Sequence, residues 1–106
     1  MKQWSILLVF LSLSLSLSAQ QGYEKDVFVS STGDSLPYRM IRPESMKAGK
    51  KYPLVLFLHG AGERGNDNER QLTHGGQMFL NPVNREKYPA FVLVPPCPAG
   101  SYWADP

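Results

Sequence analysis

A continuous apolar run, Leu54 to Leu58, constrains the fold of this chain more than any other feature. It follows Pro53 and ends at His59-Gly60, with no polar residue inside it. Strands that are covered on both faces, as in parallel sheets, have this pattern, whereas strands with one face in water alternate apolar and polar residues. A second run, Phe91 to Val94, is closed by Pro95-Pro96 and repeats the pattern. The two runs predict parallel strands of one sheet.

The segment between the two runs predicts a helix, so that strand, helix and strand form one βαβ unit. Asn66 is a suitable N-cap, and Glu69 three residues later completes a capping box. Four residues fall on one face of this helix: Leu72, Gly76, Phe79 and Leu80. Gly75 and Gly76 weaken it, and they either end its first part or allow close approach to the sheet.

A β-hairpin is predicted before the first apolar run. Residues Tyr23 to Ser31 and Ser35 to Arg42 are rich in β-branched and aromatic side chains, and Thr32-Gly33-Asp34 between them supplies turn chemistry. Pro37 suits an edge or the start of a strand because it lacks a backbone donor. Residues 43–51 have no apolar periodicity and predict a solvated connection. The expected fold class is α/β, with an antiparallel hairpin followed by a βαβ unit.

Composition and charge exclude some classes of protein. The 106 residues have an ordinary globular composition, and Lys and Arg exceed Asp and Glu only by 11 to 9. No run of basic residues could follow a phosphate backbone, so nucleic acid is not an expected partner. The one cysteine, Cys97, is either a small buried apolar residue or half of a disulfide.

The first 19 residues are typical of a secretory signal peptide. Lys2 precedes an apolar stretch from Trp4 to Leu17, and the small residues Ser18 and Ala19 come before a polar switch at Gln20. The apolar stretch is shorter than the roughly 20 residues of a membrane-spanning helix. We therefore expect cleavage near Ala19, a secreted or periplasmic protein, and no membrane association after removal of the signal.

Residues 60–65, Gly-Ala-Gly-Glu-Arg-Gly, match the dinucleotide-binding pattern G-x-G-x-x-G after a strand. In that motif the helix starts within the glycines, whereas here Gly65-Asn66-Asp67 delays it, and Glu63 would place a carboxylate near the phosphates. The acidic residue expected after the next strand is missing, since that strand ends in Pro95-Pro96. A P-loop is excluded because Asn66, and not Lys, follows Gly65.

A metal site is not predicted either. Five potential ligands lie close together in the sequence, but none of their spacings matches a zinc motif: His59, Glu63, Asp67, Glu69 and His74. We interpret them as loop and helix-surface residues. No metal and no cofactor is expected.

The loop after Leu58 suits a third role, in which backbone N–H groups stabilise a developing oxyanion. Open α/β sheets bind ligands at the carboxyl ends of their strands, and small residues allow the backbone to approach a substrate carbonyl. Residues 52–68, YPLVLFLHGAGERGNDN, with residues 87–98, KYPAFVLVPPCP, and then Trp103, resemble secreted bacterial esterases of the α/β-hydrolase superfamily. These include esterases of the phospholipase/carboxylesterase kind and relatives of prolyl-oligopeptidase-type peptidases. The resemblance covers most of the chain after residue 19.

The resemblance implies roles for individual loop residues. Ala61, with Gly60 before it, would supply one oxyanion N–H, and the residue after the nucleophile would supply the other. Gly60 and Gly62 would serve the backbone conformation of the loop. His59 is expected to brace the loop, because the catalytic base of this superfamily follows the nucleophile in the chain. Two further expectations are an ion pair between Glu63 and Arg64, and a position on the helix surface for His74.

The nucleophile itself is missing, because no Gly-x-Ser-x-Gly elbow occurs in the sequence. We expect residues 20–106 to be the N-terminal portion of a hydrolase domain, with the catalytic Ser, Asp and His further downstream. The predicted whole is a serine hydrolase of carboxylic esters, acting on a small-molecule or polymer-linked substrate. A peptidase with the same triad and a non-catalytic binding module on the same fold are the alternatives, and the oligomeric state stays open. This portion alone is expected to be inactive and poorly soluble.

Overall fold

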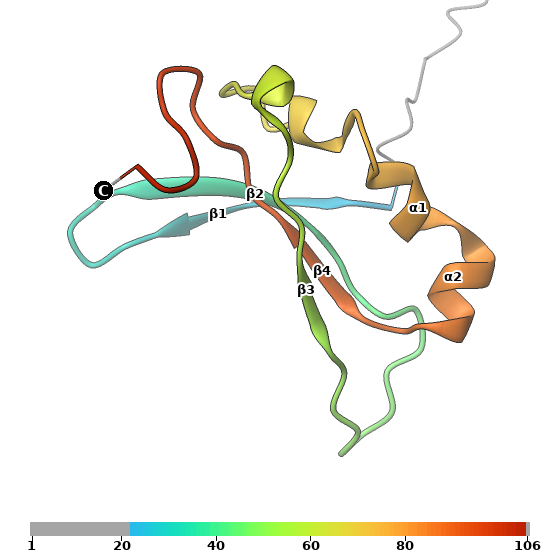
Figure 1. The fold of residues 1–106 in the computed structure, drawn as a ribbon. Coiled ribbons are helices and arrows are strands. Elements are labelled where there is room, and N and C mark those ends of the chain that lie inside the picture. The colour runs from blue at the N-terminus through green and yellow to red at the C-terminus, as the bar shows by residue number, and fades with distance from the viewer. Residues whose placement is uncertain (1–21, 106) are drawn as a thin grey trace, which may run out of the picture.

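The computed structural model describes residues 22–105, which form one mixed four-stranded sheet with short helices (Figure 1). Its elements in chain order are β1 (Glu24–Val29), β2 (Ser35–Ile41), β3 (Leu54–Leu56), the 3-10 turns η1 (Ala61–Glu63) and η2 (Arg70–Leu72), α1 (Gly76–Leu80), α2 (Pro82–Lys87) and β4 (Phe91–Val94). The chain therefore has an α/β fold. The predicted signal peptide lies outside the described residues. In the part that is described, no helix has the length and apolar character to cross a membrane.

The sheet has the order β1-β2-β4-β3. β1 and β2 pair antiparallel around a turn in which Gly33 has a φ of +91°. β2 pairs antiparallel with β4, and β4 pairs parallel with β3, with Val55 opposite Val92. Because β3 and β4 are parallel, the segments that follow them leave the sheet at the same edge.

The helix predicted from Asn66 is not formed as one element. Asp67 instead accepts hydrogen bonds from the N–H groups of Glu69 (2.9 Å) and Arg70 (3.0 Å), which also lowers the pKa of its carboxyl group. Asn68 is left-handed, with a φ of +56°. Further along, Gly75 at φ +86° separates η2 from α1. The segment is therefore divided into η2, α1 and α2.

The capping residue of α2 is Asn81. Its side chain accepts from the N–H groups of Val83 (3.0 Å) and Asn84 (3.3 Å), and Pro82 occupies the first helical position. Both features are favourable local signals for a helix start.

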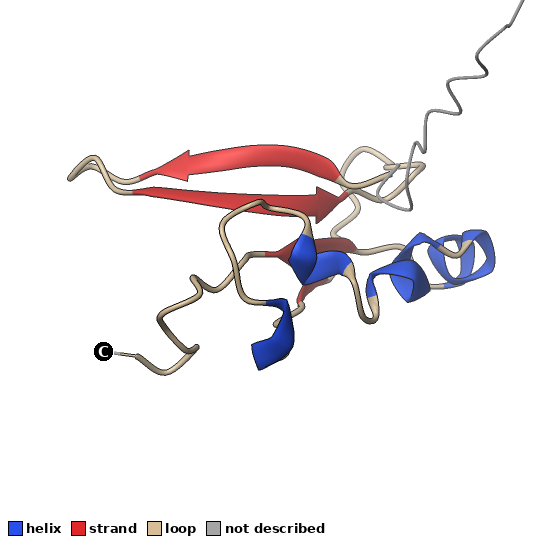
Figure 2. Ribbon diagram, turned by 90° about the horizontal axis from the view of Figure 1, so that it is seen from above, coloured by secondary structure: helices blue, strands red, loops and turns tan. Residues whose placement is uncertain are grey.

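The core lies between the sheet and these short helices, which follow one another on one side of it (Figure 2). The buried apolar residues come from β1's start, β2, η2 and β4: Tyr23, Ile41, Leu72, Val92 and Val94. Val55, Phe57, Phe79 and Leu80 pack against them, and the rings of Phe57 and Phe79 meet edge to face at 5.5 Å.

The other face of β3 is uncovered in the described chain. Leu54, Leu56 and Leu58 are 64%, 57% and 45% exposed, and β3 is an edge strand that ends at Leu56. Within residues 22–105, the segment 54–58 is therefore covered on one face only. Side chains alternate across a strand, so Val55 and Phe57 face the helices while the three leucines face away.

Buried polar side chains connect the hairpin to the segment after η1 by hydrogen bonds. Arg39, only 6% exposed, donates from Nε to the carbonyl of Asn68 (2.8 Å). Asn68 Nδ2 donates to the carbonyl of Tyr38 (3.2 Å), and Gln71 Nε2 donates to Asn68 Oδ1. These bonds satisfy polar groups that would be costly to bury alone.

The tight packing of Gly75 leads to a first prediction. A Cβ at Gly75 would lie 2.9 Å from Cζ of Phe57, whereas one at Gly33 would meet no atom within 4 Å, although both residues have positive φ. Gly33→Ala should lower the free energy of unfolding by about 1 kcal/mol through the backbone alone. Gly75→Ala should lower it by roughly 2–4 kcal/mol, because the ring must also move. Urea unfolding measures both losses, and equal losses would contradict the packing described.

Tyr23 leads to a prediction about pH. Its hydroxyl donates to the carbonyl of Gly76 (2.8 Å), and burial raises its pKa from 10.0 to about 12. The unfolded chain loses this proton first, so the stability that the neutral side chain contributes is complete below pH 10 and falls as the pH rises toward 12. The loss should be about 2 kcal/mol. Tyr23→Phe cannot titrate here, so its stability should fall less steeply between those pH values. The free energy of unfolding, measured with urea, is compared between wild type and Tyr23→Phe as a function of pH. Equal pH dependence in the two proteins would refute the prediction.

Candidate functional site

The candidate site is formed where the segments after β3 and β4 meet at one edge of the sheet (Figure 1). We call residues 59–65 the β3 loop and residues 97–103 the β4 segment. Gly65 N–H donates to the carbonyl of Cys97 (2.9 Å), and Arg64 reaches the carbonyl of Ser101 (2.8 Å). The two segments are therefore joined by direct hydrogen bonds as well as by their neighbouring strands.

His59 lies at the centre of this junction and is only 4% exposed. Its Nε2 accepts the N–H of Cys97 (2.8 Å), so the ring proton is on Nδ1, which donates to the carbonyl of Gly60 (2.7 Å). Trp103 packs edge to face on the ring at 5.0 Å. Both ring nitrogens are occupied by backbone groups, and neither is free to act as a base.

Trp103 and Arg64 hold two further carbonyls of the β3 loop. The indole N–H of Trp103 donates to the carbonyl of His59 (2.9 Å). Arg64 donates from Nε to the carbonyl of Ala61 (3.0 Å) and from a terminal nitrogen to Ser101. Arg64 thus bridges η1 and the β4 segment.

The expected ion pair between Glu63 and Arg64 is wrong. Glu63 Oε1 instead lies 3.6 Å from Nε2 of His74, whose side chain is 78% exposed. Neighbouring residues on a helical turn point in different directions, and Arg64 is directed to backbone carbonyls.

Ala61 is exposed, and its N–H and that of Gly62 donate no hydrogen bond within residues 22–105. Both groups belong to the first positions of η1, where backbone donors lack partners inside the turn. Two adjacent donors on exposed residues, without a partner among residues 22–105, therefore lie at the edge where the β3 loop meets the β4 segment.

The glycines beside Ala61 do not have unusual backbone angles. Gly60 is extended, with φ −78° and ψ 173°, and Gly62 has no positive φ. A Cβ on Gly60 would lie 3.2 Å from Glu63 Oε2, whereas one on Gly62 would meet nothing within 4 Å. Neither residue therefore has the positive φ that would require glycine. Gly60 leaves room for the Glu63 carboxylate, and an added Cβ at Gly62 would meet open space.

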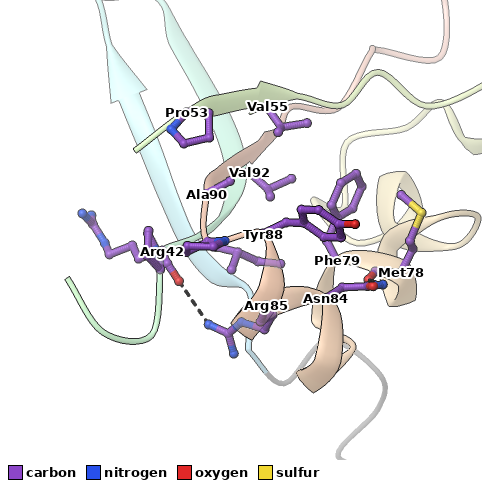
Figure 3. Close-up of a pocket in the computed structure, with 13 residues that line it drawn as sticks. Arg42, Pro53, Val55, Met78, Phe79, Asn84, Arg85, Tyr88, Ala90 and Val92 are labelled. Atoms are coloured by element: carbon purple, nitrogen blue, oxygen red, sulfur yellow. Dashed lines mark hydrogen bonds between the residues drawn. The ribbon is translucent and has the colours of Figure 1, made fainter. Parts of the chain in front are cut away.

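A cavity of about 410 Å³ lies at the opposite edge of the sheet (Figure 3). Pro53 and Ala90, which precede β3 and β4, line it together with Phe79 and Tyr88. Arg85 at its rim donates to the carbonyl of Arg42 (3.1 Å) and pairs with Glu44 at 2.9 Å. The cavity is mainly apolar, its two arginines, Arg42 and Arg85, are paired with Glu24 and Glu44, and it is remote from Ala61.

The five acidic and histidine residues considered as metal ligands are placed individually. His59 faces backbone groups, and Glu63 faces His74. Asp67 caps the turn at the N–H groups of residues 69 and 70, and the Glu69 carboxylate lies 3.7 Å from Arg39. Among residues 22–105 no three His, Cys, Asp or Glu side chains are grouped as a metal site would require.

Sequence reasoning assigned no role to the β4 segment, although one signal was available. Pro95, Pro96 and Pro98 have no N–H, so Cys97 carries the single backbone donor of residues 95–98. Cys97 is buried, so this donor needs an acceptor, and His59 supplies it. The contacts of Arg64 and Trp103 had no comparable local signal.

Comparisons with known proteins agree with an α/β hydrolase-like chain. No protein-family model matches the sequence, and no curated protein matches it. A solved structure described as the crystal structure of a thermostable esterase superposes with a TM-score of 0.69 and is 40% identical in sequence. The match covers 77% of this chain and 23% of that esterase, so the present chain spans about a quarter of its length. The fold is therefore of the esterase and hydrolase type.

Proposed function

We propose that this chain is the N-terminal portion of an exported serine hydrolase that cleaves carboxylic esters. The observation that carries the proposal is the pair of N–H groups at Ala61 and Gly62, which have no partner among residues 22–105 and lie at the carboxyl edge of two parallel strands. The 40% identity to an esterase supports the choice of ester over other substrates. The exposed leucines of β3 support the view that this portion belongs to a larger domain.

In this mechanism a serine supplied by a later part of the protein attacks the ester carbonyl. Negative charge develops on the carbonyl oxygen, and the Ala61 N–H donates to it, together with the N–H after the nucleophile. The alcohol leaves, and water then releases the acyl group from the serine. The β3 loop contributes electrostatic stabilisation and no proton transfer, because both nitrogens of His59 are bound to backbone groups.

Fluorophosphonate labelling of the complete exported protein tests the proposal. The expected result is one labelled serine outside residues 1–106, with loss of nitrophenyl-ester hydrolysis in proportion to labelling. Faster cleavage of proline-containing peptides than of nitrophenyl esters would replace the esterase by a peptidase. Absence of labelling and of hydrolysis would refute the proposal and favour a binding module.

A further inference from the structure

Three consecutive peptide groups of the β3 loop are each held from their carbonyl side by a different side chain. Trp103 Nε1 donates to the carbonyl of His59 (2.9 Å), His59 Nδ1 to that of Gly60 (2.7 Å), and Arg64 Nε to that of Ala61 (3.0 Å). The three donors come from the β4 segment, from the loop's beginning and from its end. Two of these carbonyls also accept the backbone bonds of η1, Gly60 from the N–H of Glu63 (3.2 Å) and Ala61 from the N–H of Arg64 (3.5 Å), so the side-chain donors add to the backbone bonds there.

The carbonyl contacts determine where the N–H groups point. In a planar trans peptide the C=O and the N–H of the next residue point in opposite directions. The bond to the His59 carbonyl therefore orients the N–H of Gly60. In the same way, the bond to the Gly60 carbonyl orients the N–H of Ala61, and the bond to the Ala61 carbonyl orients the N–H of Gly62. A donor on the carbonyl also polarises the peptide and makes its N–H a stronger donor.

We propose that Trp103 and Arg64 are positioning residues for the oxyanion site: they hold the two peptide groups that flank the one carrying the Ala61 N–H, which His59 itself holds. The inference rests on the function proposed above and deepens it, because it assigns to the β4 segment a part in transition-state stabilisation. Arg64 also donates to Ser101 (2.8 Å), which fixes the guanidinium between the two segments. Neither side chain touches the reacting atoms, and each acts through a peptide group.

The test uses the complete protein, nitrophenyl acetate as substrate and an alkyl boronic acid as the transition-state analogue. Trp103→Phe keeps an aromatic ring on His59 but removes the indole donor, and Arg64→Met removes the guanidinium at similar length. We expect each to lower kcat roughly 10- to 100-fold with little change in KM, because misdirected donors matter mainly in the transition state. The inhibition constant of the boronic acid should rise by the same factor.

Matched controls separate positioning from general damage. Tyr102→Phe changes the neighbouring aromatic residue, which is 60% exposed, and Arg70→Met changes an exposed arginine that lies 3.6 Å from Asp67. Both should retain kcat and boronate affinity within about twofold. Arg64→Lys keeps a charged donor but lacks the planar fork that reaches both carbonyls, so it should recover part of the loss in kcat.

The two proposals fail in different ways. A wild-type protein that neither hydrolyses esters nor binds the boronic acid overturns the proposed function, and this inference with it. An active wild type whose Trp103→Phe and Arg64→Met variants keep kcat within twofold overturns only the positioning role. Variants that unfold more easily but lose kcat without a parallel loss of boronate affinity overturn it as well.

Discussion

Ala61→Pro is expected to lower kcat for ester hydrolysis by about 10²–10³-fold, which corresponds to the loss of one oxyanion donor. Proline removes the N–H that the proposed mechanism uses and leaves the carbonyl in place. KM should change little, because the missing bond strengthens mainly as negative charge develops. Initial rates with nitrophenyl esters in the complete protein measure both constants.

The local backbone can accept proline at residue 61, so the substitution should remove the N–H without disturbing the loop. Gly60 is extended, at φ −78° and ψ 173°, which is the conformation that a following proline favours. Ala61 is the first residue of η1, a position where proline fits and where the N–H has no internal partner. Ala61→Ser, which keeps the N–H, is the matched control and should retain kcat within a few fold. A folded Ala61→Pro enzyme with unchanged kcat would show that this N–H does not bind the oxyanion.

His59→Ala should lower the free energy of unfolding by roughly 2–4 kcal/mol. It leaves the buried N–H of Cys97 without an acceptor, which costs about 1–3 kcal/mol, and it removes the ring that packs on Trp103. His74→Ala is the matched control, because that side chain is 78% exposed and lies 3.6 Å from Glu63. The free energy of unfolding of His74→Ala should fall by under 0.5 kcal/mol, which is roughly the contribution of an exposed ion pair.

Urea unfolding of both variants distinguishes a bracing role from a surface role. His59→Gln carries an amide oxygen that can accept in place of Nε2, and it should recover part of the stability lost in His59→Ala. Equal losses for His59→Ala and His74→Ala would mean that the contacts of His59 contribute little to the loop.

The strands could be predicted because their signals are local. Thr32-Gly33-Asp34 lies between two segments of strand formers, and β1 and β2 pair around it with Gly33 at φ +91°. The apolar runs at residues 54–58 and 91–94 contain β3 and β4, which pair in parallel. Each of these signals depends on residues within one segment, so a single sequence is sufficient to detect it.

The helix after the β3 loop could not be predicted, because distant residues compete for its backbone. Asn68 takes a left-handed conformation, and its carbonyl and side chain bind Arg39 and the carbonyl of Tyr38 on β2. A local capping rule at Asn66 contains no information about these contacts, which span about thirty residues. The cap at Asn81, followed by Pro82, was a local signal that sequence reasoning overlooked.

The sequence alone determined three features. These are the strand patterns of the hairpin and of the two apolar runs, the small residues of the β3 loop, and the absence of a Gly-x-Ser-x-Gly elbow. Only the tertiary structure decided which groups hold that loop: Cys97 and Trp103 reach His59 across 38 and 44 residues of chain. The physical reason is that a peptide N–H is present at every residue except proline, so its presence carries no signal. Its direction depends on what binds the carbonyl on its other side, and those partners are brought there by the parallel pairing of β3 with β4.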